Sequence, residues 1–286
     1  MNTITERAYA KVNLSLDVLQ KRRDGYHDLR MIMQTVSLCD ELTLTPTEEP
    51  VFRARCNLRY LPNNENNLAT MAAKAYYRAV NREGGMVVDL VKNIPVGAGL
   101  GGGSADAAAV LRALGREGLL REDELLSLAL QCGSDVPFCL RGGTQLAESR
   151  GERLRALPAL PACFIVLCKP AVSIATRAVF MKLKASALRH HPDTDGIIQA
   201  LSEGSLVNVA RRMYNALEDS VSAEYKDIAA IHAMMLALGA AGVVMSGTGS
   251  AVIGVFEEQS DAAQAEKHLA AFYPETYLTQ PVSAFL

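Results

Sequence analysis

The sequence has few of the features that would commit it to nucleic acid, to a membrane surface or to a metal. Lys and Arg (29) nearly balance Asp and Glu (31). The formal net charge of −2 argues against a nucleic acid or an anionic membrane held by bulk positive charge. The six cysteines form no C-x-x-C pair and no metal-type spacing with the five histidines. We therefore expect them to be small core residues in a reducing compartment, the cytoplasm.

Signals for export or membrane insertion are also missing. The opening residues, MNTITERAYAK, have no charged segment followed by an apolar core, so they do not predict a signal peptide. One weakly polar stretch, Ile228–Met245, is rich in Ala and Gly and is divided by Gly239 and Gly242. This pattern predicts a helix, a turn and a strand rather than a membrane span.

Two common nucleotide-binding motifs are excluded. The sequence has no G-x-x-x-x-G-K-[ST], so it contains no Walker P-loop. Gly97, Gly99 and Gly102 match G-x-G-x-x-G, but a Rossmann site needs a second strand about twenty residues later. Residues 121–132 predict another helix, and Pro95 interrupts the entry from the preceding strand. A Rossmann site is therefore excluded.

A dense glycine loop is the feature around which the chain is organised. Five of the seven residues from Gly97 to Gly103 are glycine, between a strand predicted over 86–91 and an Ala-rich helix predicted over 104–114. A flexible linker or an ordinary tight turn fits this setting poorly, because linkers are polar and do not join a buried strand to such a helix. Bare N–H groups and a helix start together predict an anion site, and we expect the anion to be a nucleotide polyphosphate.

Three other places carry polar side chains that invite a function. Lys11 and Asn13 share the polar face of a strand predicted around residues 12–18, where a lysine is ordinarily a solvated edge charge. Tyr26 and His27 follow an Asp-Gly turn, where they are either surface residues or a site for a flat ring. Asp135 follows a helix-ending glycine, and its pattern alone predicts an N-cap for the next helix.

The length of 286 residues suits two domains better than one. Residues 157–161 (LPALP) resemble a connector, so we place the domains at 1–155 and 156–286. Strands and helices follow one another without strict alternation, which predicts an α+β fold in both halves. A last strand is expected over residues 277–285.

Taken together, five separated motifs resemble the GHMP small-molecule kinases, and the likeness covers nearly the whole chain. The glycine loop is typical of the family as a whole. The combination of D-G-Y-H with S-D-V-P is typical of its member that phosphorylates a cytidyl-diphospho-methylerythritol in isoprenoid precursor biosynthesis. The motifs are Ala10–Leu14, Arg23–His27, Pro95–Ala105, Gly133–Pro137 and Ser246–Ser250. The resemblance implies an N-terminal domain like domain 2 of ribosomal protein S5, a ferredoxin-like C-terminal domain and a cleft between them.

The resemblance also implies a reaction, the transfer of the γ-phosphoryl group of ATP to the 2-hydroxyl of that substrate. Asp135 would be the catalytic base and Lys11 its partner, which is chemically reasonable because a carboxylate in reach can take the hydroxyl proton and an ammonium keeps it ionised. On the substrate side, Tyr26 and Phe180 would sandwich the cytosine and His27 would read its edge. Asn13 and Thr176 would contact the methylerythritol part.

On the nucleotide side, the glycine loop would wrap the phosphates of ATP. Asn67 and Lys92 would lie near the adenosine, and Ser104 is a candidate ligand of Mg²⁺ or of a phosphate oxygen. Two departures from the family pattern are one hydroxyl instead of two after the loop, and no proline before Thr176. The expected loop residues are Pro95, Val96, Gly97, Ala98, Gly99, Leu100, Gly101, Gly102, Gly103, Ser104 and Ala105.

Two alternatives remain open at this point. The first is another kinase of the family, acting on homoserine or on a mevalonate-type alcohol. The second is a nucleotide-binding protein, or an S5-like RNA-binding module, without catalysis. Lys11 and Asp135 argue against a protein without catalysis, and the acidic pI near 6.2 argues against RNA. We expect small-molecule partners only, and a monomer or a homodimer.

Overall fold

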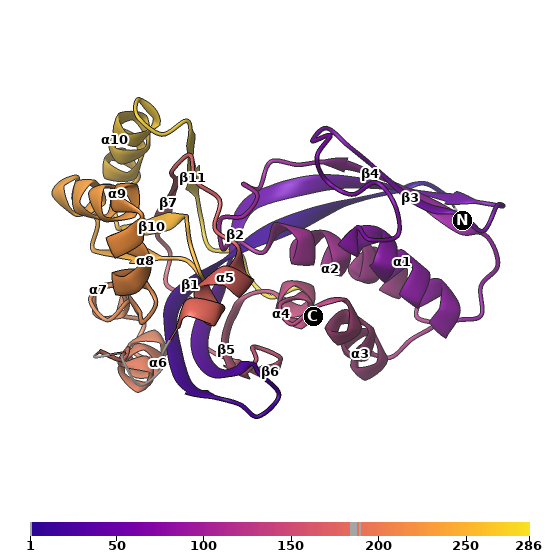
Figure 1. Cartoon of the computed structure of the whole chain (residues 1–286), viewed down its shortest axis with the longest axis horizontal. Helices are drawn as coiled ribbons and strands as arrows, with labels where there is room; N and C mark the ends of the chain where they lie inside the picture. Colours follow the sequence, from indigo (N-terminus) through magenta and orange to yellow (C-terminus); the bar gives the residue numbers. More distant parts are fainter. Residues whose placement is uncertain (1, 184–187, 189) are drawn as a thin grey trace.

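The computed structural model describes residues 2–183, 188 and 190–286. It has two halves, and in each a sheet is covered by helices (Figure 1). The predicted α+β class is confirmed. The cleft described below lies where the two halves meet.

The N-terminal half is built on a seven-stranded sheet with the helices α1 to α4 packed below it (Figure 1). The two long strands β1 and β2 pair antiparallel through the centre of the sheet, and their alternating residues bury the core. The strands are β1 (Ile4–Lys21), β2 (His27–Thr47), β3 (Phe52–Cys56), β4 (Gly85–Val91), β5 (Thr144–Ser149), β6 (Arg153–Ala156) and β8 (Tyr214–Asn215), and the helices are α1 (Leu68–Ala79), α2 (Gly102–Gly115), α3 (Glu122–Cys132) and α4 (Val136–Arg141).

The local sequence explains how the helices around the cleft begin and pack. α2 follows the glycine loop as predicted, and its alanines at 105 and 107–109 are buried, which brings the helix close to the sheet. α1 begins after Asn67, whose side chain accepts a hydrogen bond from the backbone N–H of Ala69.

The C-terminal half is an antiparallel four-stranded sheet of order β11-β7-β10-β9. In this order the first strand of the domain lies between its third and its fourth, which is the ferredoxin-like arrangement expected for this domain. The strands are β7 (Phe164–Lys169), β9 (Gly242–Met245), β10 (Val252–Phe256) and β11 (Glu275–Thr279), and the helices are α5 (Thr176–Lys182), α6 (Thr194–Ser202), α7 (Leu206–Ala210), α8 (Glu218–Glu224), α9 (Lys226–Ala237) and α10 (Gln259–Ala270).

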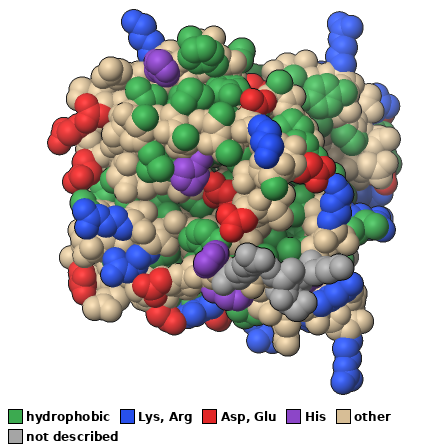
Figure 2. Space-filling view, turned by 60° about the vertical axis from the view of Figure 1, so that its left-hand side comes forward, with side chains coloured by type: hydrophobic (Ala, Val, Ile, Leu, Met, Phe, Trp, Pro, Cys, Tyr) green, Lys and Arg blue, Asp and Glu red, His purple; other side chains and the backbone are tan. Residues whose placement is uncertain are grey.

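The weakly polar stretch 228–245 forms most of α9, a turn and β9, as predicted. Among the residues that the structure describes, no helix combines the length and the apolar character needed to cross a membrane. Acidic and basic side chains are interspersed on the face of the C-terminal half that Figure 2 brings forward. This mixed surface agrees with the near-zero net charge.

The chain does not divide cleanly at residue 155, because two later segments return to the N-terminal sheet. The short strand β8 pairs in parallel with β1. The expected last strand over 277–285 was too long, since β11 ends at Thr279 and the following residues run along β2 toward α4 (Figure 1).

The physical reason is an unpaired length of β2. This strand pairs with β5 through residues 29–34 and with β4 through residues 41–47, which leaves backbone groups between them without a strand. The last residues supply the missing partners: the backbone of Thr35 accepts from Val282 at 2.8 Å, and Ser37 donates to Gln280 at 2.9 Å. Phe285 then stacks on Tyr9, with ring centroids 5.4 Å apart.

The cysteines are free thiols, as expected. Cys132, Cys139, Cys163 and Cys168 are buried, and burial raises the pKa of Cys139 and of Cys163 to about 12. Such thiols are protonated at neutral pH and behave as small apolar side chains.

Candidate active site

A cleft of about 1220 Å³ opens between the two halves. Its walls come from β1, the loop before α2, the start of α4, α5 and the turn after β9. The cleft brings together almost every residue that the sequence singled out. These are Lys11, Asn13, Tyr26, His27, Asn67, Lys92, the loop residues from Pro95 to Ser104, Asp135, Thr176 and Phe180.

The glycine loop is held by its carbonyl groups. Gly97, Gly99 and Gly101 have positive φ angles of 66°, 75° and 68°, so the loop needs glycine at alternate positions. Six successive carbonyl oxygens accept hydrogen bonds from the surrounding protein. The pairs are Val96 with Ser173 Oγ (3.2 Å), Gly97 with Ile174 N (3.1 Å), Ala98 with Ala251 N (3.1 Å), Gly99 with Ser246 Oγ (3.0 Å), Leu100 with Lys11 N (3.0 Å) and Gly101 with Ala105 N (2.8 Å).

The carbonyl groups of the loop are bonded to the protein, whereas none of the backbone N–H groups of residues 96–101 donates a backbone hydrogen bond within the described residues, so they are available to a ligand in the cleft. The same holds for the start of α2, whose N-cap is Gly101 and which has no side chain bonded at that end. The helix dipole adds partial positive charge at this end. The loop and the helix start therefore have the properties of the anion site that the sequence predicts, and anion binding itself stays a prediction.

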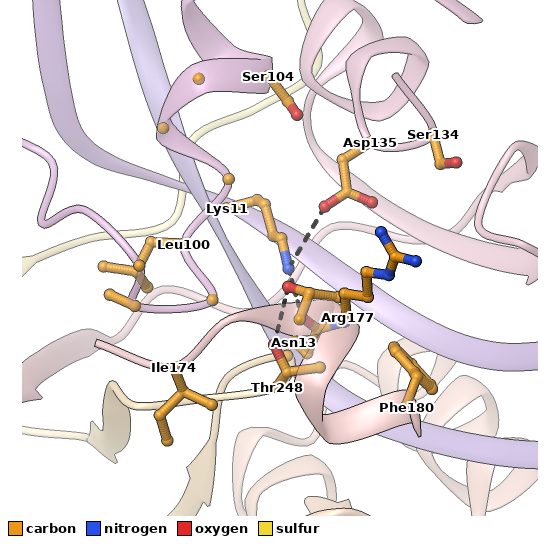
Figure 3. Close-up of a pocket in the computed structure, with 18 of the residues that line it drawn as sticks. Lys11, Asn13, Leu100, Ser104, Ser134, Asp135, Ile174, Arg177, Phe180 and Thr248 are labelled. Atoms are coloured by element: carbon orange, nitrogen blue, oxygen red, sulfur yellow. Dashed lines mark hydrogen bonds and ion pairs between the residues drawn. The ribbon is translucent and has the colours of Figure 1, made fainter. Parts of the chain in front are cut away.

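Lys11 and Asp135 meet in the cleft, as the resemblance implied. The Nζ atom of Lys11 lies 3.8 Å from Oδ2 of Asp135 (Figure 3). Lys11 is buried, whereas about a third of the Asp135 side chain is exposed to the cleft. Lys11 is therefore not the solvated edge charge that a strand lysine ordinarily is, because it lies where the C-terminal half covers β1.

Asp135 has the position of a helix cap but not the hydrogen bond of one. It precedes α4, and its side chain makes no capping bond to that helix. A buried proline at the second position of α4 helps to begin the helix without a side-chain cap. The carboxylate is therefore directed to Lys11 and to whatever enters the cleft.

Asn13 holds Lys11 in place. Its Oδ1 atom accepts from Lys11 Nζ at 2.7 Å, and its Nδ2 atom contacts the sulfur of Met31 at 3.5 Å. The backbone N–H of Asn13 donates to Ser246 Oγ at 3.2 Å, and that hydroxyl donates to the glycine loop. Asn13 lines the cleft as expected, but its side chain is already committed to the lysine.

Lys92 lines the cleft on the side of the glycine loop, but its ammonium is buried in the protein. Its ammonium pairs with Asp40 and, at 2.5 Å, with Asp106, and all three side chains are buried. Burial opposes the charge, but the two carboxylates outweigh it and raise the pKa of Lys92. Burial raises the pKa of Asp106 to about 7. Lys92 therefore anchors the start of α2 to β2.

The aromatic residues gather at the far end of the cleft. Phe180 stacks on His27 with centroids 5.3 Å apart, and Tyr26 is exposed with the guanidinium of Arg150 5.0 Å above its ring. The cytosine sandwich between Tyr26 and Phe180 stays a prediction. Burial, together with the charge of Lys21, lowers the pKa of His27, so its ring is neutral at pH 7.

The two remaining predicted residues have partners within the protein. The hydroxyl of Thr176 lies 3.1 Å from that of Thr248, in the turn after β9. The side chain of Asn67 caps α1 and donates to Pro62 O at 2.9 Å. Sequence reasoning missed Asp40 and Asp106, which pair with Lys92, and Arg177, which lines the cleft. Asp40 and Asp106 give no local signal, since their partner Lys92 comes from another segment.

The cleft between these two domains has a glycine loop at a helix start, a lysine–aspartate pair and an end lined with aromatic rings. This combination defines a small-molecule kinase of the GHMP class. Known protein families agree with this class. The GHMP kinases N terminal domain matches residues 67–143, and the GHMP kinases C terminal domain matches residues 197–275.

Full-length relatives narrow the class. A protein from Lachnoclostridium phytofermentans is 39% identical over 98% of each chain, and one from Lachnospira eligens is 42% identical over 94% of each. Both are named 4-diphosphocytidyl-2-C-methyl-D-erythritol kinase. A crystal structure of 4-(cytidine 5'-diphospho)-2C-methyl-D-erythritol kinase, 35% identical, superposes with a TM-score of 0.83 over 97% of this chain and 99% of that one. The chain belongs to the 4-diphosphocytidyl-2-C-methyl-D-erythritol kinase family.

A homoserine kinase from Cytophaga hutchinsonii superposes with a TM-score of 0.77 at 20% identity, over 99% of this chain and 96% of that one. A likeness at this identity concerns the fold alone. The wider GHMP fold is therefore shared with enzymes that act on other alcohols, and the substrate must be argued from the residues of the cleft.

Proposed function

We propose that this protein transfers the γ-phosphoryl group of ATP to the 2-hydroxyl of 4-diphosphocytidyl-2-C-methyl-D-erythritol, a step in the methylerythritol phosphate route to isoprenoid precursors. One observation carries the proposal. Lys11 pairs with Asp135, whose side chain makes no capping hydrogen bond, between the glycine loop and the aromatic end of the cleft. The names of the full-length relatives supply the substrate.

In this reaction Asp135 takes the proton of the attacking hydroxyl. A carboxylate is a suitable base once it is held ionised and within hydrogen-bond reach. The ammonium of Lys11 favours the ionised carboxylate and stabilises negative charge on the transferring group. Asn13 keeps the ammonium on this side of β1, so the pair is positioned before the substrate arrives.

The phosphates of ATP lie on the N–H groups of the glycine loop and of the start of α2. Mg²⁺ fits this site as an ion held mainly by phosphate oxygens and water. Within the described part of the chain, no group of three or more His, Cys, Asp or Glu side chains is placed to hold a metal. Ser104 is the residue that would complete its shell, and its chemistry is to neutralise charge on the phosphates.

A second function, phosphorylation of homoserine or mevalonate, uses the same loop and the same pair. In that reaction the rings of Tyr26, His27 and Phe180 would have no nucleobase to bind, since neither alcohol carries one. His27 is the most telling of the three. Its Nε2 atom is buried and has no partner within the described residues, as expected for a group that hydrogen-bonds a ligand.

The test is ADP release with ATP, Mg²⁺ and the cytidyl substrate, compared with homoserine and mevalonate in the same assay. We expect turnover of the cytidyl substrate alone, and a loss of about 10²–10⁴ in kcat for Asp135→Asn. Asp123→Asn makes the same change on the exposed surface of α3 and should leave the rate unaltered. Turnover of another alcohol, or an active Asp135→Asn, would contradict the proposal.

A further inference from the structure

Arg177 is a cation that lines the cleft and belongs neither to the lysine–aspartate pair nor to the glycine loop. It lies in the first turn of α5, is exposed, and lines the cleft. Within the part of the chain that the structure describes, no carboxylate forms an ion pair with its guanidinium. Figure 3 shows the side chain extended across the cleft toward Asp135.

Its neighbours on α5 place Arg177 between two ends of the cleft. Thr176 precedes it and contacts Thr248, in the turn whose glycine at 247 approaches Lys11. Phe180 follows one turn later and stacks on His27. Arg177 thus stands between the lysine–aspartate pair, where the hydroxyl reacts, and the rings, where a base is bound.

The other cations that line the cleft are already engaged or lie at its ends. Lys11 is held by Asn13 and Asp135, and Lys92 by two buried carboxylates. Arg150 covers the ring of Tyr26, and Lys21 lies near His27 at the base end. The middle of the cleft therefore has Arg177 as its uncommitted positive charge.

A substrate that reaches from the rings to the lysine–aspartate pair must pass Arg177. The part of the substrate that passes it is the link between the base and the alcohol. In a cytidyl-diphospho alcohol that link is a diphosphate. A guanidinium has planar donors that match two phosphate oxygens at once, which a lysine ammonium does not.

We propose that Arg177 binds the diphosphate of the substrate and so fixes the distance between the bound base and the reacting hydroxyl. This assignment rests on the proposed function. It makes Arg177 a specificity residue that selects a nucleoside diphosphate link over a neutral one. The bond strengthens binding before and during phosphoryl transfer alike, because the diphosphate itself does not react.

The experiment compares Arg177→Met and Arg177→Lys with the wild type in the same ADP-release assay. In Arg177→Met we expect the KM for the cytidyl substrate to rise about 10- to 100-fold, with kcat and the KM for ATP nearly unchanged. Arg177→Lys should recover part of the loss, because it restores the charge but not the paired donors. Lys182→Met, on the same helix and paired at 2.9 Å with Glu224, is the matched control and should behave as the wild type.

A binding measurement needs no turnover. By calorimetry, the wild type should bind CDP more tightly than cytidine, and Arg177→Met should lose about tenfold or more of that preference while its affinity for cytidine stays the same. An unchanged preference for CDP would overturn the proposal. So would a fall in kcat at constant KM, since it would place Arg177 on the transferred phosphate. A wild type that neither turns over the substrate nor binds CDP would instead refute the proposed function itself.

Discussion

A methyl group at Gly99 tests whether the glycine loop is held by the C-terminal half. A Cβ atom there would lie 2.1 Å from the carbonyl oxygen of Ser246, and the residue has a φ of +75°. Real side chains do not make contacts this short, so the Gly99→Ala variant must move either the loop or the turn after β9. That turn carries Ser246, which bonds both the loop and β1.

The expected cost has two parts. A left-handed alanine costs about 1–2 kcal/mol, and overfilling a packed contact costs about 1–3 kcal/mol more. Gly118→Ala is the matched control, since Gly118 has a φ of +71° and would place its Cβ in open space. The control should therefore show the strain alone, about 1–2 kcal/mol.

The assay is urea unfolding followed by circular dichroism, together with the KM for ATP. We expect Gly99→Ala to lose more unfolding free energy than Gly118→Ala by about 1–3 kcal/mol. We also expect a rise of about tenfold or more in the KM for ATP, because a shift of about 1 Å in the loop misplaces its N–H groups. Equal losses of stability in the two variants, with an unchanged KM for ATP, would refute the close contact as the support of the loop.

Three further outcomes follow from the site. In steady-state kinetics, Asn13→Ala should lower kcat about tenfold, because the ammonium of Lys11 loses the acceptor 2.7 Å away; an unchanged kcat would show that Asp135 alone positions it. Ser246→Ala should raise the KM for ATP more than Ser250→Ala, whose hydroxyl bonds Val172 outside the loop; equal effects would contradict the coupling through Ser246. Burial raises the pKa of Asp106 from 3.8 to about 7, so the folded state keeps a proton that the unfolded chain releases. Relative to Asp106→Asn, the free energy of unfolding of the wild type should fall as the pH rises from about 4 to about 7, and a difference that does not vary over this range would refute the shift.

Much of the fold and of the site follows from local sequence. The glycines at 97, 99 and 101 predict the loop because no other residue takes their backbone angles at little cost, and Asn67 predicts the start of α1 because its cap uses a neighbouring N–H group. The partners of Lys92 could not be predicted in this way. Asp40 is 52 residues away and Asp106 is 14 away on another element, so only the packing of β2 against α2 brings them together.

The burial of Lys11 and the stacking of the aromatic rings also depend on contacts between distant segments, which local sequence does not specify. The alternation along β1 is compatible with one solvated face, but the turn after β9, more than two hundred residues later, covers that face. At the rings, the motifs correctly brought Tyr26, His27 and Phe180 into one cleft. Which ring stacks on which depends on the orientation of α5, which no local pattern specifies.

The return of residues 280–286 to β2 has a consequence for the order of synthesis. β1 and β2 leave the ribosome early, yet the carbonyl of Thr35 and the N–H of Ser37 find their partners only when residues 280–282 are made. At ordinary rates of translation this interval is on the order of ten seconds. During this time the growing chain carries an open sheet edge beside its future active site, a place for a chaperone or a neighbouring nascent chain to bind.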